Sequence, residues 1–229
     1  MTVAVLSGTA RERVIQAACT LGLWLGAAAC AGAGAGAGKR EAPSAWTVLL
    51  DAERLTDWKA TAFGGEGDVI VEDDLIVLEM GSPLTGLSWT GGELPRWDYE
   101  LEVTARRLAG TDFFCGLTFP VGESHATLIL GGWGGALTGL SCIDGADASE
   151  NETTTFIAYE RGREVSARVR VTRAEISTWL DGELLHTVGL VGHTVGLRPE
   201  VLLSRPLGVA SFLARSGLRD LRLRRVGAD

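Results

Sequence analysis

Residues 99–105 read Tyr99-Glu100-Leu101-Glu102-Val103-Thr104-Ala105, with apolar and polar side chains in strict alternation. Successive side chains of a β-strand point to opposite faces of the sheet, so the apolar residues share one face and the polar residues share the other. This alternation is typical of a strand with one buried face. Residues 165–171 repeat it, and the apolar positions of residues 218–226 predict a last strand.

Short turn signals separate the apolar runs of the chain. Three of them are Glu72-Asp73-Asp74, Thr172-Arg173 and Asp181-Gly182. Strands joined by tight turns pair antiparallel. After residue 40, no helical apolar period extends beyond one or two turns. We therefore predict an all-β fold, a sandwich of two antiparallel sheets.

Length and charge limit the classes of function. The chain has 229 residues and a formal net charge of −8. A sandwich of this size is commonly a single domain. A basic surface supplies most of the affinity of proteins for nucleic acid, and this acidic chain has no such surface. We expect no nucleic-acid partner.

The first residues have the three parts of an export signal. Arg11 and Arg13 precede an uncharged, mostly apolar run from residue 14 to residue 29, and small residues follow it. The apolar run is shorter than the ~20 residues that a membrane-spanning helix needs. The chain is therefore expected outside the cytoplasm, as a periplasmic, membrane-anchored or secreted protein.

The end of this leader allows two kinds of processing. Leu25-Gly26-Ala27-Ala28-Ala29-Cys30 resembles a bacterial lipobox, with Ala27 where a leucine is usual, and an Ala-x-Ala cleavage site is the alternative. A membrane would be contacted only through the leader or a lipidated Cys30. We predict a leader at residues 1–30, a flexible Ala/Gly-rich tether at 31–44 and a β-sandwich domain at 45–227.

Several segments together resemble the 3-keto-disaccharide hydrolase domain family, formerly called DUF1080. The segments are Trp46–Asp51, Leu55–Trp58, Asp68–Leu75, Trp97–Leu101, Ile176–Glu183, Pro206–Ala210 and Leu218–Leu223. Each is a common kind of hairpin or strand, and it is their order and spacing that carries the resemblance. The resemblance implies a concanavalin A-like jelly roll, frequent export and a carbohydrate ligand.

The chain departs from the family pattern in two strands. Where many members carry polar residues, this chain has the largely apolar segments Asp112–Phe119 and Ala126–Leu130. The family's activity on 3-keto-glycosides therefore does not carry over residue by residue, and the chain is interpreted as a divergent branch.

An acidic loop interrupts the alternation between residues 144 and 153. Its carboxylates are Asp144, Asp147, Glu150 and Glu152, and Asn151 and Thr153 lie among them. Paired carboxylates carry out acid–base work on glycosides, which makes the four acids candidate catalytic residues and the other two candidate substrate contacts. The same oxygens could hold Ca²⁺, or the loop could simply be solvated. We expect no other metal and no cofactor.

The tryptophans fall into two groups. Trp133 lies between two glycine pairs, where its indole could stack on a sugar ring or pack on a neighbouring loop. His125 begins the strand that leads to Trp133 and is a further candidate sugar contact. The tryptophans expected to point inward or to the rim are Trp46, Trp58, Trp97 and Trp179.

Arg198-Pro199-Glu200 precedes an apolar run, and we expect Arg198 and Glu200 to form an ion pair at a sheet edge. The three histidines are dispersed and lack the spacing of a zinc site.

Two hypotheses for function are favoured, and a third is less favoured. One is an exported hydrolase acting on glycosides, including 3-keto-glycosides. The alternative is a non-catalytic, lectin-like module that binds glycan through Trp133 and the acidic loop, and fold alone does not choose between them. The third is an envelope protein whose sandwich only packs against other proteins.

Overall fold

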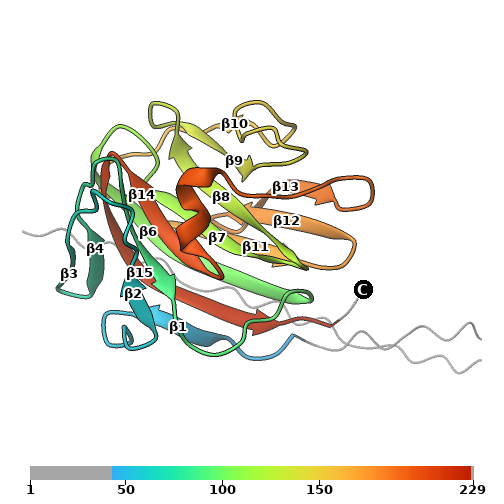
Figure 1. The fold of residues 1–229 in the computed structure, drawn as a ribbon, viewed down its shortest axis with the longest axis horizontal. Helices are drawn as coiled ribbons and strands as arrows, with labels where there is room; N and C mark the ends of the chain where they lie inside the picture. The colour runs from blue at the N-terminus through green and yellow to red at the C-terminus, as the bar shows by residue number, and fades with distance from the viewer. Residues whose placement is uncertain (1–42, 228–229) are drawn as a thin grey trace, which may run out of the picture. The chain divides into compact units, whose positions relative to one another are not determined.

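The computed structural model describes residues 43–227. Within this range, fifteen β-strands and one 3-10 helix form two antiparallel sheets that pack face to face (Figure 1). The predicted all-β, jelly-roll sandwich is confirmed. The predicted leader, Cys30 and nearly all of the predicted tether lie outside the described residues.

The first sheet has eight strands. In spatial order, seven of them are β13 (Glu183–Gly189), β12 (Glu175–Leu180), β11 (Val165–Val171), β6 (Tyr99–Gly110), β15 (Ala214–Arg225), β4 (Leu75–Leu78) and β3 (Val69–Glu72). The eighth, β1 (Thr47–Asp51), also pairs with β15. The heptapeptide at residues 99–105 lies in β6, between β11 and β15, where one of its faces is buried.

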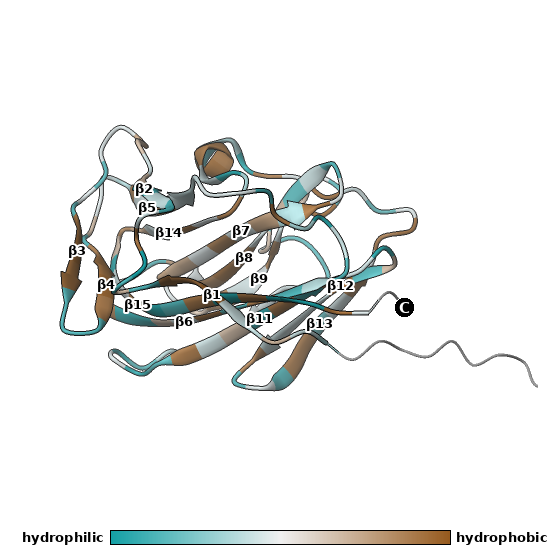
Figure 2. Ribbon diagram, turned by 90° about the horizontal axis from the view of Figure 1, so that it is seen from below, coloured by the Kyte–Doolittle hydropathy of each residue, from teal (hydrophilic) through white to brown (hydrophobic). Residues whose placement is uncertain are grey.

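The second sheet has seven strands. Their order is β10 (Thr155–Phe156), β9 (Leu137–Ser141), β8 (Ser124–Gly132), β7 (Cys115–Val121), β14 (Gly208–Phe212), β5 (Leu84–Trp89) and β2 (Trp58–Ala60). The 3-10 helix η1 (Pro199–Ser204) contacts β5 and β14, and it lies on the side of this sheet that faces away from the first sheet (Figure 2). Among the described residues, no helix is long and apolar enough to cross a bilayer.

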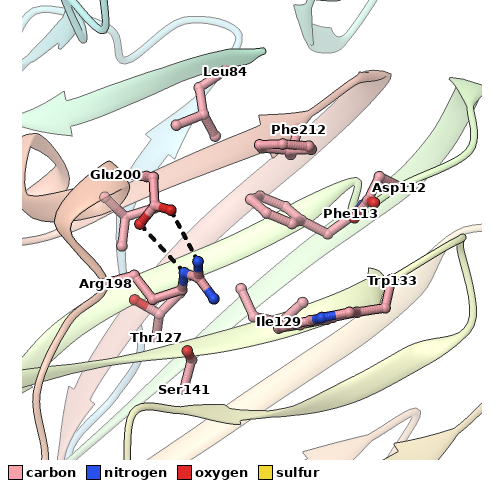
Figure 3. A pocket seen from close by; sticks show the side chains of 11 residues that line it. Leu84, Asp112, Phe113, Thr127, Ile129, Trp133, Ser141, Arg198, Glu200 and Phe212 are labelled. Carbon is pink, nitrogen blue, oxygen red and sulfur yellow. Dashed lines mark hydrogen bonds and ion pairs between the residues drawn. The ribbon is translucent and has the colours of Figure 1, made fainter. Parts of the chain in front are cut away.

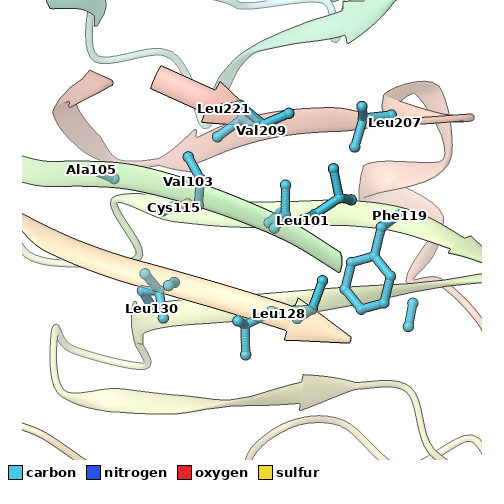
Figure 4. Close-up of a cluster of buried hydrophobic side chains, with 14 of the residues drawn as sticks. Leu101, Val103, Ala105, Cys115, Phe119, Leu128, Leu130, Leu207, Val209 and Leu221 are labelled. Carbon is cyan, nitrogen blue, oxygen red and sulfur yellow. The ribbon is translucent and has the colours of Figure 1, made fainter. Parts of the chain in front are cut away.

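The core fills the space between the sheets. Apolar residues of β6 and β15 meet those of β7, β8 and β14, among them Leu101, Phe119 and Leu128 (Figure 4). Tyr99 is fully buried, and its hydroxyl donates a hydrogen bond to the Pro120 carbonyl at 2.5 Å. Replacing a buried leucine of such a core by alanine costs about 2–5 kcal/mol. The core therefore fixes the two sheets as one platform.

The outer face of the first sheet carries a continuous layer of charges and indole rings. Glu100, which is 0% exposed, accepts hydrogen bonds from Arg170 and Arg224 on the two neighbouring strands. The guanidinium of Arg170 lies 5.3 Å from the Trp179 ring centre, and that of Arg224 lies 4.5 Å from the Trp46 ring centre.

The tryptophans are therefore distributed differently from the sequence prediction. Trp58 is buried in the core, as expected. Trp46 and Trp179 instead lie outside the first sheet, because outward-pointing arginines of β11 and β15 cover their rings. A local alternation pattern does not show that an arginine of the neighbouring strand will cover a ring on the outer face.

Candidate functional site

The outer face of the second sheet is hollowed by a cavity of about 230 Å³ (Figure 3). It lies between η1, the end of β14, strand β8 and the turn that follows β8. Its lining residues are Leu84, Asp112, Phe113, Thr127, Ile129, Trp133, Ser141, Arg198, Glu200, Val201 and Phe212. The lining is mostly apolar. Most of its polar groups lie toward Arg198 and Glu200, and Asp112 lies beside Phe113 at the other end (Figure 3). An apolar lining with a few polar groups is the usual character of a small-molecule site.

Small side chains keep this face of the sheet open. Gly116 of β7 lies beneath Phe113 and Ile129, and a Cβ at that position would approach the Phe113 ring to 3.1 Å. Beside it, the hydroxyls of Thr118 and Thr127 hydrogen-bond to each other across β7 and β8 at 3.0 Å. These two hydroxyls satisfy each other, and the aromatic rings can lie close to the strands.

Three aromatic rings form the apolar end of the cavity. Phe113 precedes β7 and Phe212 ends β14, and their ring centres are 5.6 Å apart with the planes inclined by 32°. Trp133 follows β8 and is 43% exposed. Figure 3 shows its indole beside Ile129, on the floor of the cavity below the two phenylalanine rings. A large ring left this exposed at a cavity is available to a ligand.

Arg107 holds the turn that carries Trp133. It projects from β6 of the first sheet and donates hydrogen bonds to the carbonyls of Gly131 at 3.2 Å and Gly135 at 2.6 Å. Trp133 itself has a φ of 46°, a conformation that costs a non-glycine residue about 1–3 kcal/mol. Burial lowers the pKa of Arg107. By binding both ends of the turn, Arg107 keeps the strained residue in place.

Arg198 and Glu200 form the polar end of the cavity. The Arg198 Nη2 and Nε donate to the two carboxylate oxygens of Glu200 at 2.9 and 3.3 Å, and its Nη1 donates to Asp147. The predicted ion pair between Arg198 and Glu200 therefore forms, and it lines the cavity. The hydrogen bond with Glu200 raises the pKa of Arg198 and lowers the pKa of Glu200, so both stay charged.

The four carboxylates of the acidic loop do not converge. Asp144 accepts hydrogen bonds from the Thr194 backbone N–H and from His193 Nδ1, both at 2.7 Å, and the bond from Thr194 is the main reason that its pKa is lowered. Asp147 turns the other way, to Arg198. Glu150 and Glu152 are exposed. Of the four, Asp147 is the one connected to the cavity lining.

Asn151 and Thr153 connect the acidic loop to β9. The Asn151 amide donates to the carbonyls of Leu140 and Asp147, each at 2.8 Å, and its oxygen accepts from the Thr153 hydroxyl at 2.6 Å. Thr153 is buried and its hydroxyl also accepts the Leu140 N–H. In the structure these two side chains bind backbone and each other.

His125 lies at a different cavity, of about 390 Å³, which Arg96, Glu123 and Pro206 also line. Burial, with smaller contributions from Arg205 and Arg96, lowers its pKa. It is not among the residues that line the cavity at Trp133. Within residues 43–227, no three His, Cys, Asp or Glu side chains are grouped as a metal site would require.

Comparison with known proteins gives the fold. No family model and no curated protein sequence matches the chain. Solved structures that resemble it include the Crh5 transglycosylase in complex with NAG, with a TM-score of 0.56 and 11% identity over 83% of this chain and 88% of that one. A galectin-like protein of unknown function from Bacillus subtilis has a TM-score of 0.57 and 10% identity over 83% and 99%.

A third similar structure is the carbohydrate recognition domain of Emp46p in a metal-free form, with a TM-score of 0.52 and 14% identity over 75% of this chain and 89% of that one. At such identities the likeness concerns architecture. The resemblance to the 3-keto-disaccharide hydrolase family stays a prediction. The described part of the chain has the concanavalin-like and galectin-like β-sandwich fold.

Proposed function

We propose that this chain is a carbohydrate-binding domain whose ligand enters the cavity at Trp133. The observation that carries the proposal is the composition of that cavity, with an exposed indole and two phenylalanine rings at one end and a fixed arginine–glutamate pair at the other. A pyranose ring has the same division, with an apolar C–H face and hydroxyls around its edge.

Each end of the cavity matches one part of a sugar. An aromatic ring buries apolar area at little conformational cost, since it has few rotatable bonds. Arg198 and Glu200 offer N–H donors and carboxylate acceptors in a fixed arrangement, and such groups pair with the donor and acceptor of a hydroxyl. The proposal is supported by two of the similar structures, a transglycosylase in complex with NAG and a carbohydrate recognition domain.

Glycan-binding measurements with the purified protein test this function. Trp133→Ala should weaken binding of any bound glycan by on the order of 2 kcal/mol, about thirtyfold, as a truncated aromatic anchor does. Trp179→Ala is the matched control, because its ring lies on the outer face of the other sheet. Isothermal titration gives both affinities. Equal affinity of the Trp133 variant and the control would refute a site at this cavity.

A hydrolase acting on glycosides, including 3-keto-glycosides, is the second candidate. The observation that favours it is that Asp112 and Glu200 both line the cavity, and glycoside hydrolysis uses two carboxyl groups. We rank it second because Arg198 already holds both carboxylate oxygens of Glu200, at 2.9 and 3.3 Å, and lowers its pKa. Asp112 would then have to be the proton donor, yet its Oδ1 accepts the Phe113 N–H at 2.8 Å, a contact that favours the ionised carboxylate.

Product analysis separates the two candidates. Incubation with 3-keto-trehalose and ordinary disaccharides should leave both intact if the domain only binds. Turnover that Asp112→Asn and Glu200→Gln abolish, while Glu152→Gln leaves it unchanged, would replace the binding proposal with the hydrolase.

We also propose that the leader at residues 1–30 directs export of the chain, which then functions outside the cytoplasm. Mass spectrometry of the mature N-terminus distinguishes a lipidated Cys30 from cleavage at an Ala-x-Ala site. Retention of residues 1–30 in a cytoplasmic fraction would contradict the proposal.

A further inference from the structure

A second cavity, of about 400 Å³, adjoins the cavity at Trp133. Its lining residues are Cys142, Gly145, Asp147, Thr194, Val195, Gly196, Leu197, Arg198 and Pro199. Arg198 lines both cavities, and the consecutive residues Ser141 and Cys142 at the end of β9 line one each. The two hollows are therefore neighbours on one face of the molecule.

The ion pair of Arg198 with Asp147 lies where the two linings meet, because Arg198 lines both cavities and Asp147 lines the second. Arg198 donates to Asp147 Oδ2, and the Ser141 hydroxyl lies 3.3 Å from Asp147 Oδ1. On the other side the Cys142 thiol lies 3.6 Å from the same oxygen. A ligand that fills both cavities would pass over this ion pair, where donors and acceptors are already in position.

The far side of the second cavity is held in place by hydrogen bonds. Asp144 accepts from the Thr194 N–H at 2.7 Å, and the Gly196 N–H donates to the Cys142 carbonyl at 3.0 Å. The Ser124 hydroxyl donates to the Val195 carbonyl at 2.7 Å. The segment from Thr194 to Leu197 is thus fixed to β8 and to the residues after β9. A wall that is already ordered costs a ligand little entropy on binding.

Charge narrows the class of ligand. Of the described residues that line the two cavities, three carry carboxylates, Asp112, Asp147 and Glu200, and one carries a cationic group, the guanidinium of Arg198. Arg198 already donates to Glu200 and Asp147, so it offers an anion no unpaired charge. A uronate or sulfated sugar would meet a lining of its own sign, and like charges brought together in a site are repelled.

We infer that the two cavities are subsites of one site, and that its ligand is an uncharged glycan of at least two sugar rings. One ring lies against Trp133, and the next lies beyond Arg198 against the Thr194–Leu197 segment. The inference rests on the proposed carbohydrate function and names the length and charge of the ligand.

Titration of the full chain with saccharides of increasing length tests the inference. The probes are glucose and galactose, their β-linked and α-linked oligomers of two to four units, and oligogalacturonates of the same lengths. Affinity for the preferred neutral series should rise about tenfold or more from one ring to two, as linked subsites predict, and change little beyond three. The oligogalacturonates should bind at least about tenfold more weakly than neutral oligomers of equal length.

A variant isolates the second cavity. A Cβ at Gly196 would have nothing within 4 Å, so Gly196→Phe should fold and place its ring in that cavity. It should lower the affinity for the disaccharide to that for the single sugar and leave the latter unchanged. Gly189→Phe, at an equally open position of β13, is the matched control.

The outcomes separate the inference from the function beneath it. Equal affinity for one, two and three rings, or equal affinity for neutral and acidic oligomers, would overturn the inference and leave carbohydrate binding standing. Binding of no saccharide at any length would overturn the proposed function and the inference with it. The length series needs no variant, so a Gly196→Phe chain that fails to fold does not affect the result.

Discussion

Both sheets present tryptophan and an arginine–carboxylate pair on their outer faces, and they use them in opposite ways. On the first sheet, Glu100 is fully buried between two arginines, and these arginines cover the rings of Trp46 and Trp179. On the second sheet, none of the arginines among residues 43–227 lies over the ring of Trp133, which is 43% exposed. The same residue types make a sealed surface when neighbouring strands complete it, and an open site when a turn holds them apart.

The largest effect, a loss of folding stability, is expected on the outer face of the first sheet, around Glu100. Glu100→Ala leaves the partly exposed Arg170 and Arg224 without their shared partner, and the loss of such charge-assisted hydrogen bonds costs about 1.5–3 kcal/mol of unfolding free energy. Urea denaturation measures the loss. Glu123→Ala is the control, since that carboxylate is 93% exposed in its pair with Arg96 and should cost about 0–1 kcal/mol. Equal losses in the two variants would show that the network does not stabilise the sheet.

A smaller effect, a loss of glycan affinity at the cavity on the second sheet, is expected from Arg107→Met. This change removes both hydrogen bonds to the Trp133 turn, and one such bond is worth about 0.5–1.5 kcal/mol. If the turn loosens by the worth of one of these bonds, glycan affinity falls up to about tenfold. Hydrogen exchange at residues 131–135 should speed up in parallel.

Arg107→Lys keeps the positive charge but lacks the branched guanidinium. Its glycan affinity and its exchange rate at the turn should therefore lie between those of the wild type and of Arg107→Met. Unchanged exchange and affinity in both variants would remove Arg107 from the support of the site.

The smallest effect is a pH dependence at the open face. Arg198 holds the folded-state pKa of Glu200 below its ordinary value of 4.5. The ion pair is therefore fully formed above that pH, and its contribution is lost as the pH falls through the folded-state pKa. Because both side chains are partly exposed, the change should stay below about 1 kcal/mol.

Glycan affinity should thus be constant near neutral pH and decline only in acid. In Glu200→Gln the acid decline should disappear, and an equal decline in that variant would assign the titration to another group.

The sequence predicted the sandwich well, because strand alternation and turn residues are local signals. The turns at Asp73 and Asp181 have the positive φ of tight hairpins, and the strands around them pair as expected. These features depend on residues a few positions apart. Tertiary packing had only to agree with them.

The site could be predicted only in parts. Trp133 stood out by its glycines and Arg198 with Glu200 by their charges, yet 65 positions separate Trp133 from Arg198, and no local pattern brings them together. Phe113 and Phe212 resemble ordinary core residues in the sequence. Asn151 is a polar loop residue in the sequence, and a sequence does not tell whether an amide will face a ligand or, as here, backbone carbonyls.

Arg107 gives the site a mechanical property. It belongs to β6 of the first sheet, yet its guanidinium donates hydrogen bonds to the turn that follows β8 of the second sheet. Sliding one sheet over the other would strain these hydrogen bonds and displace Trp133. A ligand stacked on that indole would resist the same displacement, so an occupied domain should withstand shear between its layers better than an empty one.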